Sequence, residues 1–170
     1  HRQYQPKDLT DWGILGAIVG KKAGSYWEVP IIEGLEAIPN SDEMKHLGAA
    51  MASYGSTPLF HIDKITPEAK NLKLDKIDSI DVKTIGKSEF HALKSSFGIK
   101  GDKVDVVVFA APQLSIVEMQ KVADLCNKNT FKVPVIVCTS PQVYSDALRM
   151  GFVKKIESSG AKVLEGTCFY

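Results

Sequence analysis

The last third of the chain alternates apolar, β-branched runs with stretches of helical periodicity, and this alternation limits the possible folds more than any other feature. Three strands are predicted, over residues 104–109, 133–137 and 162–164. Two helices lie between them, one from Ser115 to about Cys126 and one that starts at Pro141 and ends by Gly151. Strands that alternate with helices at this spacing pair in parallel through right-handed crossovers. The sequence therefore predicts an α/β fold built from βαβ units.

The first part of the chain indicates a further α/β region. Helices are predicted over residues 11–23, 43–54 and 88–97. Strands are predicted over residues 57–62 and 77–82, and residues 29–35 form either a short strand or an extended connector. The run Thr66-Pro67-Glu68-Ala69 resembles one helical turn with proline at its first position. We expect two lobes, residues 1–75 and 76–170, joined within the polar run 70–81.

Three glycines, Gly13, Gly16 and Gly20, recur on or near one face of the first predicted helix. Thr10 or Asp11 is placed to cap the first turn of this helix. Each glycine costs a helix roughly 1 kcal/mol relative to alanine. Three glycines in one helix therefore indicate either close packing against a neighbouring element or the close approach of a ligand.

Ligands of parallel sheets bind at the edge where the carboxyl ends of the strands meet. Three loops are expected to converge there, at residues 110–115, 138–141 and 166–168. They would bring together Gln113, Thr139, Ser140 and Cys168. Ser140 is expected to cap the helix that begins at Pro141. The hydroxyls of Thr139 and Ser140, together with that helix N-terminus, can also hold a carboxylate or a phosphate.

His61 follows a buried strand and is the best-placed imidazole, because His46 and His91 fall within amphipathic helices. Asp63, two residues further on, is placed to orient its ring. The sequence leaves two interpretations of His61 open, a functional group and a core histidine whose hydrogen bonds are satisfied.

The cysteines Cys126, Cys138 and Cys168 are odd in number and widely spaced, which argues against a disulfide framework and for a reducing, intracellular compartment. Cys126 and Cys138 are expected in the core. Cys168 lies beyond the last predicted strand, either as an inert thiol or exposed at the ligand edge. A lone cysteine cannot make a metal site.

Charge and hydropathy exclude several classes of protein. Twenty-one basic against twenty acidic residues leave a net charge of +1, and no basic run exceeds a pair, so nucleic acid is not expected as a partner. No apolar segment approaches the roughly 20 residues that span a bilayer, so no membrane partner is expected and the chain is predicted to be cytoplasmic. The chain contains no dinucleotide-binding, Walker, nucleophile-elbow or zincin motif.

The order of several sequence blocks adds a family resemblance. The blocks are DWGILGAIVGKKAG followed by VPIIEGL, then LGAAMASYGSTPLFHIDKITPEA, VDVVVFAAPQLSIVEM, VPVIVCTSPQVY and RMGFVKKIESSGAKVLEGTC. Over nearly the whole chain they resemble the C-terminal half of the catalytic large subunit of aconitase X. The resemblance implies an aconitase-like three-layer α/β/α fold with mainly parallel sheets. It also implies a hydro-lyase that dehydrates phosphomevalonate in archaea or cis-3-hydroxy-L-proline in bacteria.

The resemblance further implies an iron–sulfur cluster held through cysteines, an N-terminal half, and a swivelling domain, fused or supplied as a small subunit, that closes the site. His61 and the run Thr66–Ala69 match a family His and Thr-Pro-Glu-Ala, while Cys168 matches a late cluster cysteine. Thr139-Ser140 match a Thr-Ser pair, although Pro141 replaces the arginine that often follows.

Family members typically show Gly, then Cys or Ser, then Pro-His where this chain has Ala110-Ala111-Pro112-Gln113. Gln113 can hydrogen-bond a substrate but cannot act as an acid or a base. The missing cysteine favours the amino-acid substrate, because the resemblance associates that cysteine with the archaeal enzymes.

We therefore take His61 and Ser140 as candidate catalytic residues and Gln113, Thr139 and Ser140 as candidate substrate-binding residues. Cys168 is the candidate metal ligand, in a ligand set that is incomplete in this chain. One alternative is a catalytically degenerate aconitase-like domain that serves subunit assembly or binds small anions. Another is an unrelated α/β binding domain.

Overall fold

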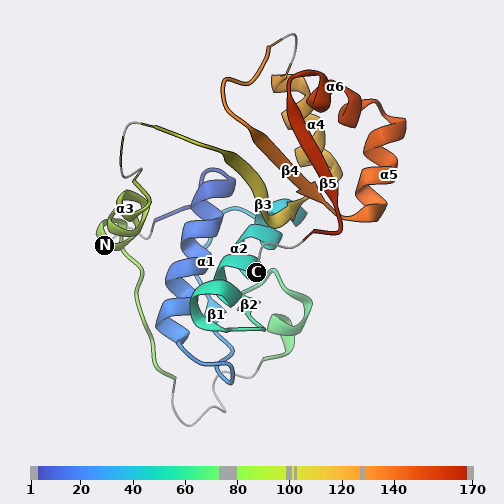
Figure 1. Cartoon of the computed structure of the whole chain (residues 1–170). Coiled ribbons are helices and arrows are strands. Elements are labelled where there is room, and N and C mark those ends of the chain that lie inside the picture. The colour runs from blue at the N-terminus through green and yellow to red at the C-terminus, as the bar shows by residue number, and fades with distance from the viewer. Residues whose placement is uncertain (1–3, 73–79, 99–100, 102, 127–128, 168–170) are drawn as a thin grey trace. The chain divides into compact units, whose positions relative to one another are not determined.

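The computed structural model describes residues 4–72, 80–98, 101, 103–126 and 129–167 (Figure 1). The chain divides into two compact units, residues 1–98 and 99–170. Each unit has its own parallel sheet and its own hydrophobic core, which confirms the predicted α/β class. In the described part of the chain, no helix combines the length and the apolar character needed to cross a membrane.

The first unit combines helices with a small parallel sheet. Its helices are α1 (Leu9–Ala23), α2 (Ser41–Gly55), the 3-10 helix η1 (Pro67–Asn71) and α3 (Lys87–Ser96). Its strands are β1 (Ile31–Ile32) and β2 (His61–Ile62), which pair in parallel with Ile31 opposite His61. Both strands are shorter than the predicted ranges 29–35 and 57–62. Of the predicted strand 77–82, residues 77–79 lie outside the described residues, and 80–82 do not form a strand.

Helices α1 and α2 pack so closely at two glycines of α1 that no side-chain atom fits between the two backbones. A Cβ atom on Gly20 would lie 2.5 Å from the Met51 carbonyl oxygen, and one on Gly16 would overlap the Leu47 carbonyl group. Nothing lies within 4 Å of the Cβ position of Gly13. The packing interpretation is therefore correct for Gly16 and Gly20 and does not apply to Gly13.

Asp11 is a buried carboxylate that joins α1 to the N-terminal segment and to α3. Its side chain is 3% exposed and accepts hydrogen bonds from the Tyr4 hydroxyl (2.8 Å), the Lys7 backbone N–H (3.2 Å) and the Lys94 ammonium group (3.0 Å). Burial by itself raises the pKa of Asp11, but the hydrogen bonds from Lys94, Tyr4 and Lys7 outweigh it, and the pKa lies below its ordinary value. The ionised form is therefore the one that stabilises the folded unit.

The first turn of α1 is capped by Asp8, and the predicted caps Thr10 and Asp11 are wrong. The Asp8 side chain accepts the Asp11 backbone N–H at 2.9 Å. Because α1 begins at Leu9, one residue after Asp8, both predicted caps lie inside the helix. The Asp11 carboxylate is thereby placed where it can face Lys94.

Helix α3 belongs to the first unit, so the chain divides after residue 98 and not after the expected residue 75. Phe90 of α3 is 1% exposed and shares a core with Trp12 and Met51. The Tyr4 ring stacks on Phe90 with 3.9 Å between the ring centroids. The boundary was predicted from the polar run 70–81, but a polar connection also occurs between two elements of one unit.

The second unit is a parallel sheet of strand order β3-β4-β5. Its strands are β3 (Val107–Leu114), β4 (Val135–Thr139) and β5 (Ala161–Glu165). Its helices are α4 (Ile116–Leu125), α5 (Pro141–Arg149) and α6 (Phe152–Ser158). The predicted βαβ units are confirmed, but α6 was missed, although Phe152, Val153 and Ile156 are apolar at helical spacing and buried.

One core holds all three helices of the second unit against the sheet. It includes Met119 of α4, Ala147 of α5 and Ile156 of α6, together with Val137 and Val163 of the strands. The helices share this core, so they lie on one face of the sheet. The described elements of the second unit thus form two layers of the three-layer arrangement that the resemblance implies.

Replacing Gly16 with alanine is expected to lower the free energy of unfolding by roughly 1–3 kcal/mol, because the new methyl group meets a backbone carbonyl that cannot rotate away. Urea unfolding followed by circular dichroism measures the change. Gly13→Ala is the matched control in the same helix and should leave stability unchanged or raise it by up to about 1 kcal/mol. Equal effects of the two substitutions would contradict the account of α1 and α2 packing.

Replacing Asp11 with asparagine is expected to lower the free energy of unfolding at pH 7 by roughly 1–3 kcal/mol, because buried donors lose a charged acceptor. The lowered pKa of Asp11 also sets a direction with pH. Its contribution is present above the unfolded pKa of about 4 and is lost as the pH falls through the folded pKa. As the pH falls below about 5, the free energy of unfolding should therefore decrease less in Asp11→Asn than in the unchanged chain.

Asp8→Asn is the control for this measurement, because it removes the same charge one helical turn away and asparagine caps helices as well as aspartate. We expect its stability to stay within about 0.5 kcal/mol of the unchanged chain. If both variants lose the same stability, net charge and not the buried Asp11 network is responsible.

Candidate functional site

The strand ends of the second unit are shaped by an irregularity in β3. Val107 to Phe109 pair in register with Val135 to Val137, but the next partners are Leu114 and Thr139. From 109 to 114 strand β3 advances five residues, while from 137 to 139 strand β4 advances two, so residues 110–113 bulge from the ladder. The predicted loop 110–115 is therefore part of β3 as far as Leu114. Its Ala111–Pro112 peptide bond is cis.

Three hydrogen bonds close a ring across these strand ends. The Gln113 side-chain amide donates to the Thr167 carbonyl oxygen (2.9 Å). The Gly166 N–H donates to the Thr139 carbonyl oxygen (3.0 Å), and the Thr139 hydroxyl donates to the Leu114 carbonyl oxygen (2.6 Å). Because Gln113 and Leu114 are neighbours in the chain, as are Gly166 and Thr167, the bonds form one closed circuit. The structure thus brings Gln113, Thr139 and the turn after β5 together, as the parallel topology predicted.

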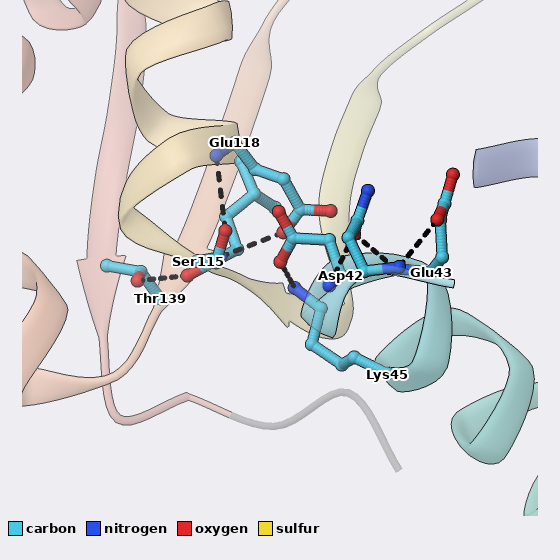
Figure 2. A network of polar contacts seen from close by, with 8 residues as sticks. Asp42, Glu43, Lys45, Ser115, Glu118 and Thr139 are labelled. Atoms are coloured by element: carbon cyan, nitrogen blue, oxygen red, sulfur yellow. Dashed lines mark hydrogen bonds and ion pairs between the residues drawn. The ribbon is translucent and has the colours of Figure 1, made fainter. Parts of the chain in front are cut away.

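The hydroxyl groups of Thr139 and Ser140 both take part in holding the backbone. Thr139 is fully buried, and Figure 2 shows its bond beside the capping box that Ser115 and Glu118 form at the start of α4. Ser140 Oγ accepts the Val143 N–H at 3.2 Å, which confirms the predicted cap of α5. Thr139 therefore contributes to the fold, while anion binding by Ser140 stays a prediction.

His61 lies in β2 of the first unit, and its ring is incompletely bonded. Its Nδ1 atom is buried without a hydrogen-bond partner, and among the described residues no other side-chain nitrogen or oxygen atom is in this state. The expected orienting group, Asp63, has its carboxylate 3.5 Å from the ammonium group of Lys64. Buried polar groups almost always have a partner, and the described residues supply none for this atom, so both interpretations of His61 stay predictions.

The described residues do not form an iron–sulfur site by themselves. Cys126 and Cys138 are buried, as predicted, and burial raises the pKa of the Cys138 thiol, which disfavours the thiolate that binds metal. Across the ranges that the structure describes, no three His, Cys, Asp or Glu side chains gather around a common point. Cys168 lies outside the described residues, and it is the one cysteine that remains as a candidate ligand.

Sequence reasoning missed the groups that complete the strand-end ring. Leu114 and Thr167 contribute backbone carbonyl oxygens, and Gly166 contributes its N–H. Every residue has a carbonyl group, so no side-chain pattern distinguishes these positions. The register shift in β3 has no clear signal either, apart from Pro112, which cannot donate to a ladder.

Family models match the two parts of the chain in order. Residues 2–95 match the model described as the aconitase X second domain, and residues 104–170 match the aconitase X third domain. A solved relative, the holo-form of Thermococcus kodakaraensis aconitase X, has a TM-score of 0.84 and 30% identity, covering 96% of this chain and 42% of that chain.

Curated relatives carry two enzyme names. The phosphomevalonate dehydratase large subunit of Methanothermobacter thermautotrophicus is 35% identical over 94% of this chain and 39% of the relative. The cis-3-hydroxy-L-proline dehydratase of Hypocrea jecorina is 29% identical over 97% of this chain and 29% of the relative. This chain thus spans about two fifths of the length of the first relative and less of the second.

Replacing Thr139 with valine is expected to lower the free energy of unfolding by roughly 1–3 kcal/mol, because it removes the buried hydroxyl that donates to the Leu114 carbonyl oxygen. Thr139→Ser is the matched control, since it retains the hydroxyl group and loses a methyl group. Chemical unfolding of both variants measures the difference. A valine variant as stable as the serine variant would show that this hydroxyl does not hold the strand ends.

Proposed function

Because the chain belongs to the aconitase X family, we propose that it is part of a hydro-lyase that dehydrates a small hydroxy acid such as cis-3-hydroxy-L-proline or phosphomevalonate. The observation that carries this proposal is the match of two consecutive domains, in order, to a family whose curated relatives are named dehydratases. The chain spans a minor part of these relatives, so we propose that activity needs the remaining length of the enzyme.

His61 is our candidate for proton transfer. Dehydration removes a proton from carbon and a hydroxyl group from its neighbour, and imidazole is the side chain most often used for such transfer. The buried, unpartnered Nδ1 atom supports this role, because a ligand at that position would complete its bonding. Ser140 is proposed as a second catalytic group, since the hydroxyl that caps α5 can still donate its own hydrogen to a bound oxygen.

Substrate binding is proposed at the strand ends of the second unit. Ser140 stands at the N-terminus of α5, where the helix favours a negative charge. Both proposed substrates carry a carboxylate, which suits this position. Gln113 and Thr139 were candidates for direct binding, but their side chains hydrogen-bond backbone carbonyl groups, so we propose that they shape the site.

We propose Cys168 as the metal ligand of this chain, with the remaining ligands in the rest of the enzyme. An iron–sulfur cluster, when bound, supplies a Lewis acid for the departing hydroxyl group. The proposal rests on the family and on the remaining cysteine, since the described side chains form no group of three ligands.

Two protein partners follow from the family. The phosphomevalonate dehydratase relatives are named large subunits, which implies a small subunit as their partner. We propose that this chain works with such a swivelling small subunit, fused or separate, and with an N-terminal half of the same enzyme. The nearly balanced charge of +1 favours neither nucleic acid nor a membrane surface, and we propose a cytoplasmic location.

A second candidate is a catalytically degenerate domain that serves subunit assembly or binds small anions. Two positions favour it, Ala111 and Gln113, where the resemblance implies a cysteine or serine and a histidine. Alanine can neither bind metal nor donate a hydrogen bond. Under this candidate the fold and the partner surfaces are retained without turnover.

The deciding experiment uses the complete enzyme, with the N-terminal half and the small subunit present, reconstituted with iron and sulfide without oxygen. We expect a visible absorption band and the dehydration of one of the two substrates, with both assayed because relatives of both kinds match. The band should disappear in Cys168→Ala. His61→Gln should keep the band and lower kcat by roughly 100- to 10,000-fold, the usual contribution of an acid–base group.

The outcomes separate the two candidates. A band without turnover of either substrate would contradict the substrate class and leave the cluster in place. Neither a band nor turnover in the unmodified enzyme would reject the hydro-lyase and support the degenerate domain. Lys64→Gln serves as the control for His61, because it alters an exposed side chain near the same strand.

A further inference from the structure

We propose that Gln113 is a positioning residue whose side-chain amide holds the main chain that leads into Cys168. The inference rests on the proposed function in one respect, since it gives Gln113 a purpose only if the Cys168 thiol must be presented to a ligand. The contact itself lies entirely between described residues of the second unit.

The contact fixes the last described residue before the cysteine. Gln113 donates its amide N–H to the Thr167 carbonyl oxygen at 2.9 Å, and Thr167 is bonded directly to Cys168 in the sequence. The preceding residue, Gly166, is held by its own N–H on the Thr139 carbonyl oxygen at 3.0 Å. Two consecutive residues of the turn are therefore tied to two different strands.

The groups that support this contact are themselves hydrogen-bonded within the second unit. Thr139 is fully buried, and its hydroxyl ties β4 to the Leu114 carbonyl oxygen, next to Gln113 in the chain. Gly166 has a φ of 65°, a left-handed conformation that turns the chain after β5. The ring of three bonds thus transmits the geometry of the strand ends to the carbonyl group before Cys168.

The bulge in β3 is what gives Gln113 this reach. Residues 110–113 stand outside the regular pairing with β4, so the Gln113 side chain is directed by the bulge and not by strand alternation. Glutamine is also chemically suited to the task. Its amide donates a hydrogen bond to a carbonyl oxygen at any ordinary pH but cannot exchange a proton with a substrate.

This role changes the interpretation of the bland sequence Ala110-Ala111-Pro112-Gln113. Gln113 makes a contact across 54 positions of sequence with the residue that precedes the candidate ligand. Residue 113 therefore has a structural role in this segment, although glutamine cannot take part in acid–base chemistry.

The test measures how fast the Cys168 thiol is alkylated by a maleimide in the unmodified chain and in three Gln113 variants, with mass spectrometry to resolve each cysteine. Cys126 and Cys138 are buried and serve as slow internal references. Gln113→Glu keeps the shape and places an acceptor against the Thr167 carbonyl oxygen, and Gln113→Leu removes all polarity. Gln113→His retains a ring N–H that can donate.

We expect the glutamate and leucine variants to raise the Cys168 alkylation rate roughly two- to tenfold, the range that follows from losing one net hydrogen bond. The histidine variant should return to within about twofold of the unmodified chain, a rescue that follows the donor and not the size of the side chain. Gln142→Leu, at an exposed position of α5, is the matched control and should change nothing. Unchanged rates in the glutamate and leucine variants would overturn the proposal, as would a fast histidine variant.

A second measurement separates this inference from the proposed function. In the complete enzyme reconstituted with iron and sulfide, the glutamate and leucine variants should shift the reduction potential of the cluster, while the histidine variant should not. If thiol rates respond to Gln113 and the unmodified enzyme forms no cluster, the positioning role stands and the proposed function fails. If a Cys168-dependent cluster forms and neither rate nor potential responds, the positioning role fails and the proposed function stands.

Discussion

Parallel pairing of β3, β4 and β5 is the constraint on which the candidate site of the second unit depends. It places the three strand ends at one edge, so residues far apart in the sequence meet there. The pairing alone would not join Gln113 to Thr167, because a regular strand would continue its alternation. The bulge between Phe109 and Leu114 interrupts this alternation, and the buried Thr139 hydroxyl holds the end of the bulge at the Leu114 carbonyl oxygen.

The first unit is held by two different physical means. Helices α1 and α2 approach through Gly16 and Gly20, so close that a methyl group would displace a backbone. Helix α3 is joined instead through Asp11, which collects donors from two other segments, and through the Phe90 side chain in the core. The first contact is apolar and depends on shape, while the second depends on charge. Lowering the pH should therefore weaken the attachment of α3, because Asp11 becomes protonated, and leave the contact between α1 and α2 unchanged.

The candidate site residues fall into two groups according to the hydrogen bonds that their side chains make. Thr139, Ser140 and Gln113 each hold a backbone group, so removing them would disturb geometry before chemistry. His61 is the exception, because its buried Nδ1 atom lacks the partner that buried polar atoms ordinarily have.

The sequence by itself determined the elements with strong local signals. The capping box at Ser115–Glu118, the proline starts of η1 and α5, and the βαβ order were all predictable, because each depends on neighbouring residues. Tertiary structure alone decided the membership of α3 and the bulge in β3. Each of these depends on what a side chain meets across the fold: Asp11 meets Lys94, Phe90 meets the first core, and Gln113 meets a carbonyl oxygen. Carbonyl groups are the same at every position, so only the folded chain can select which one is used.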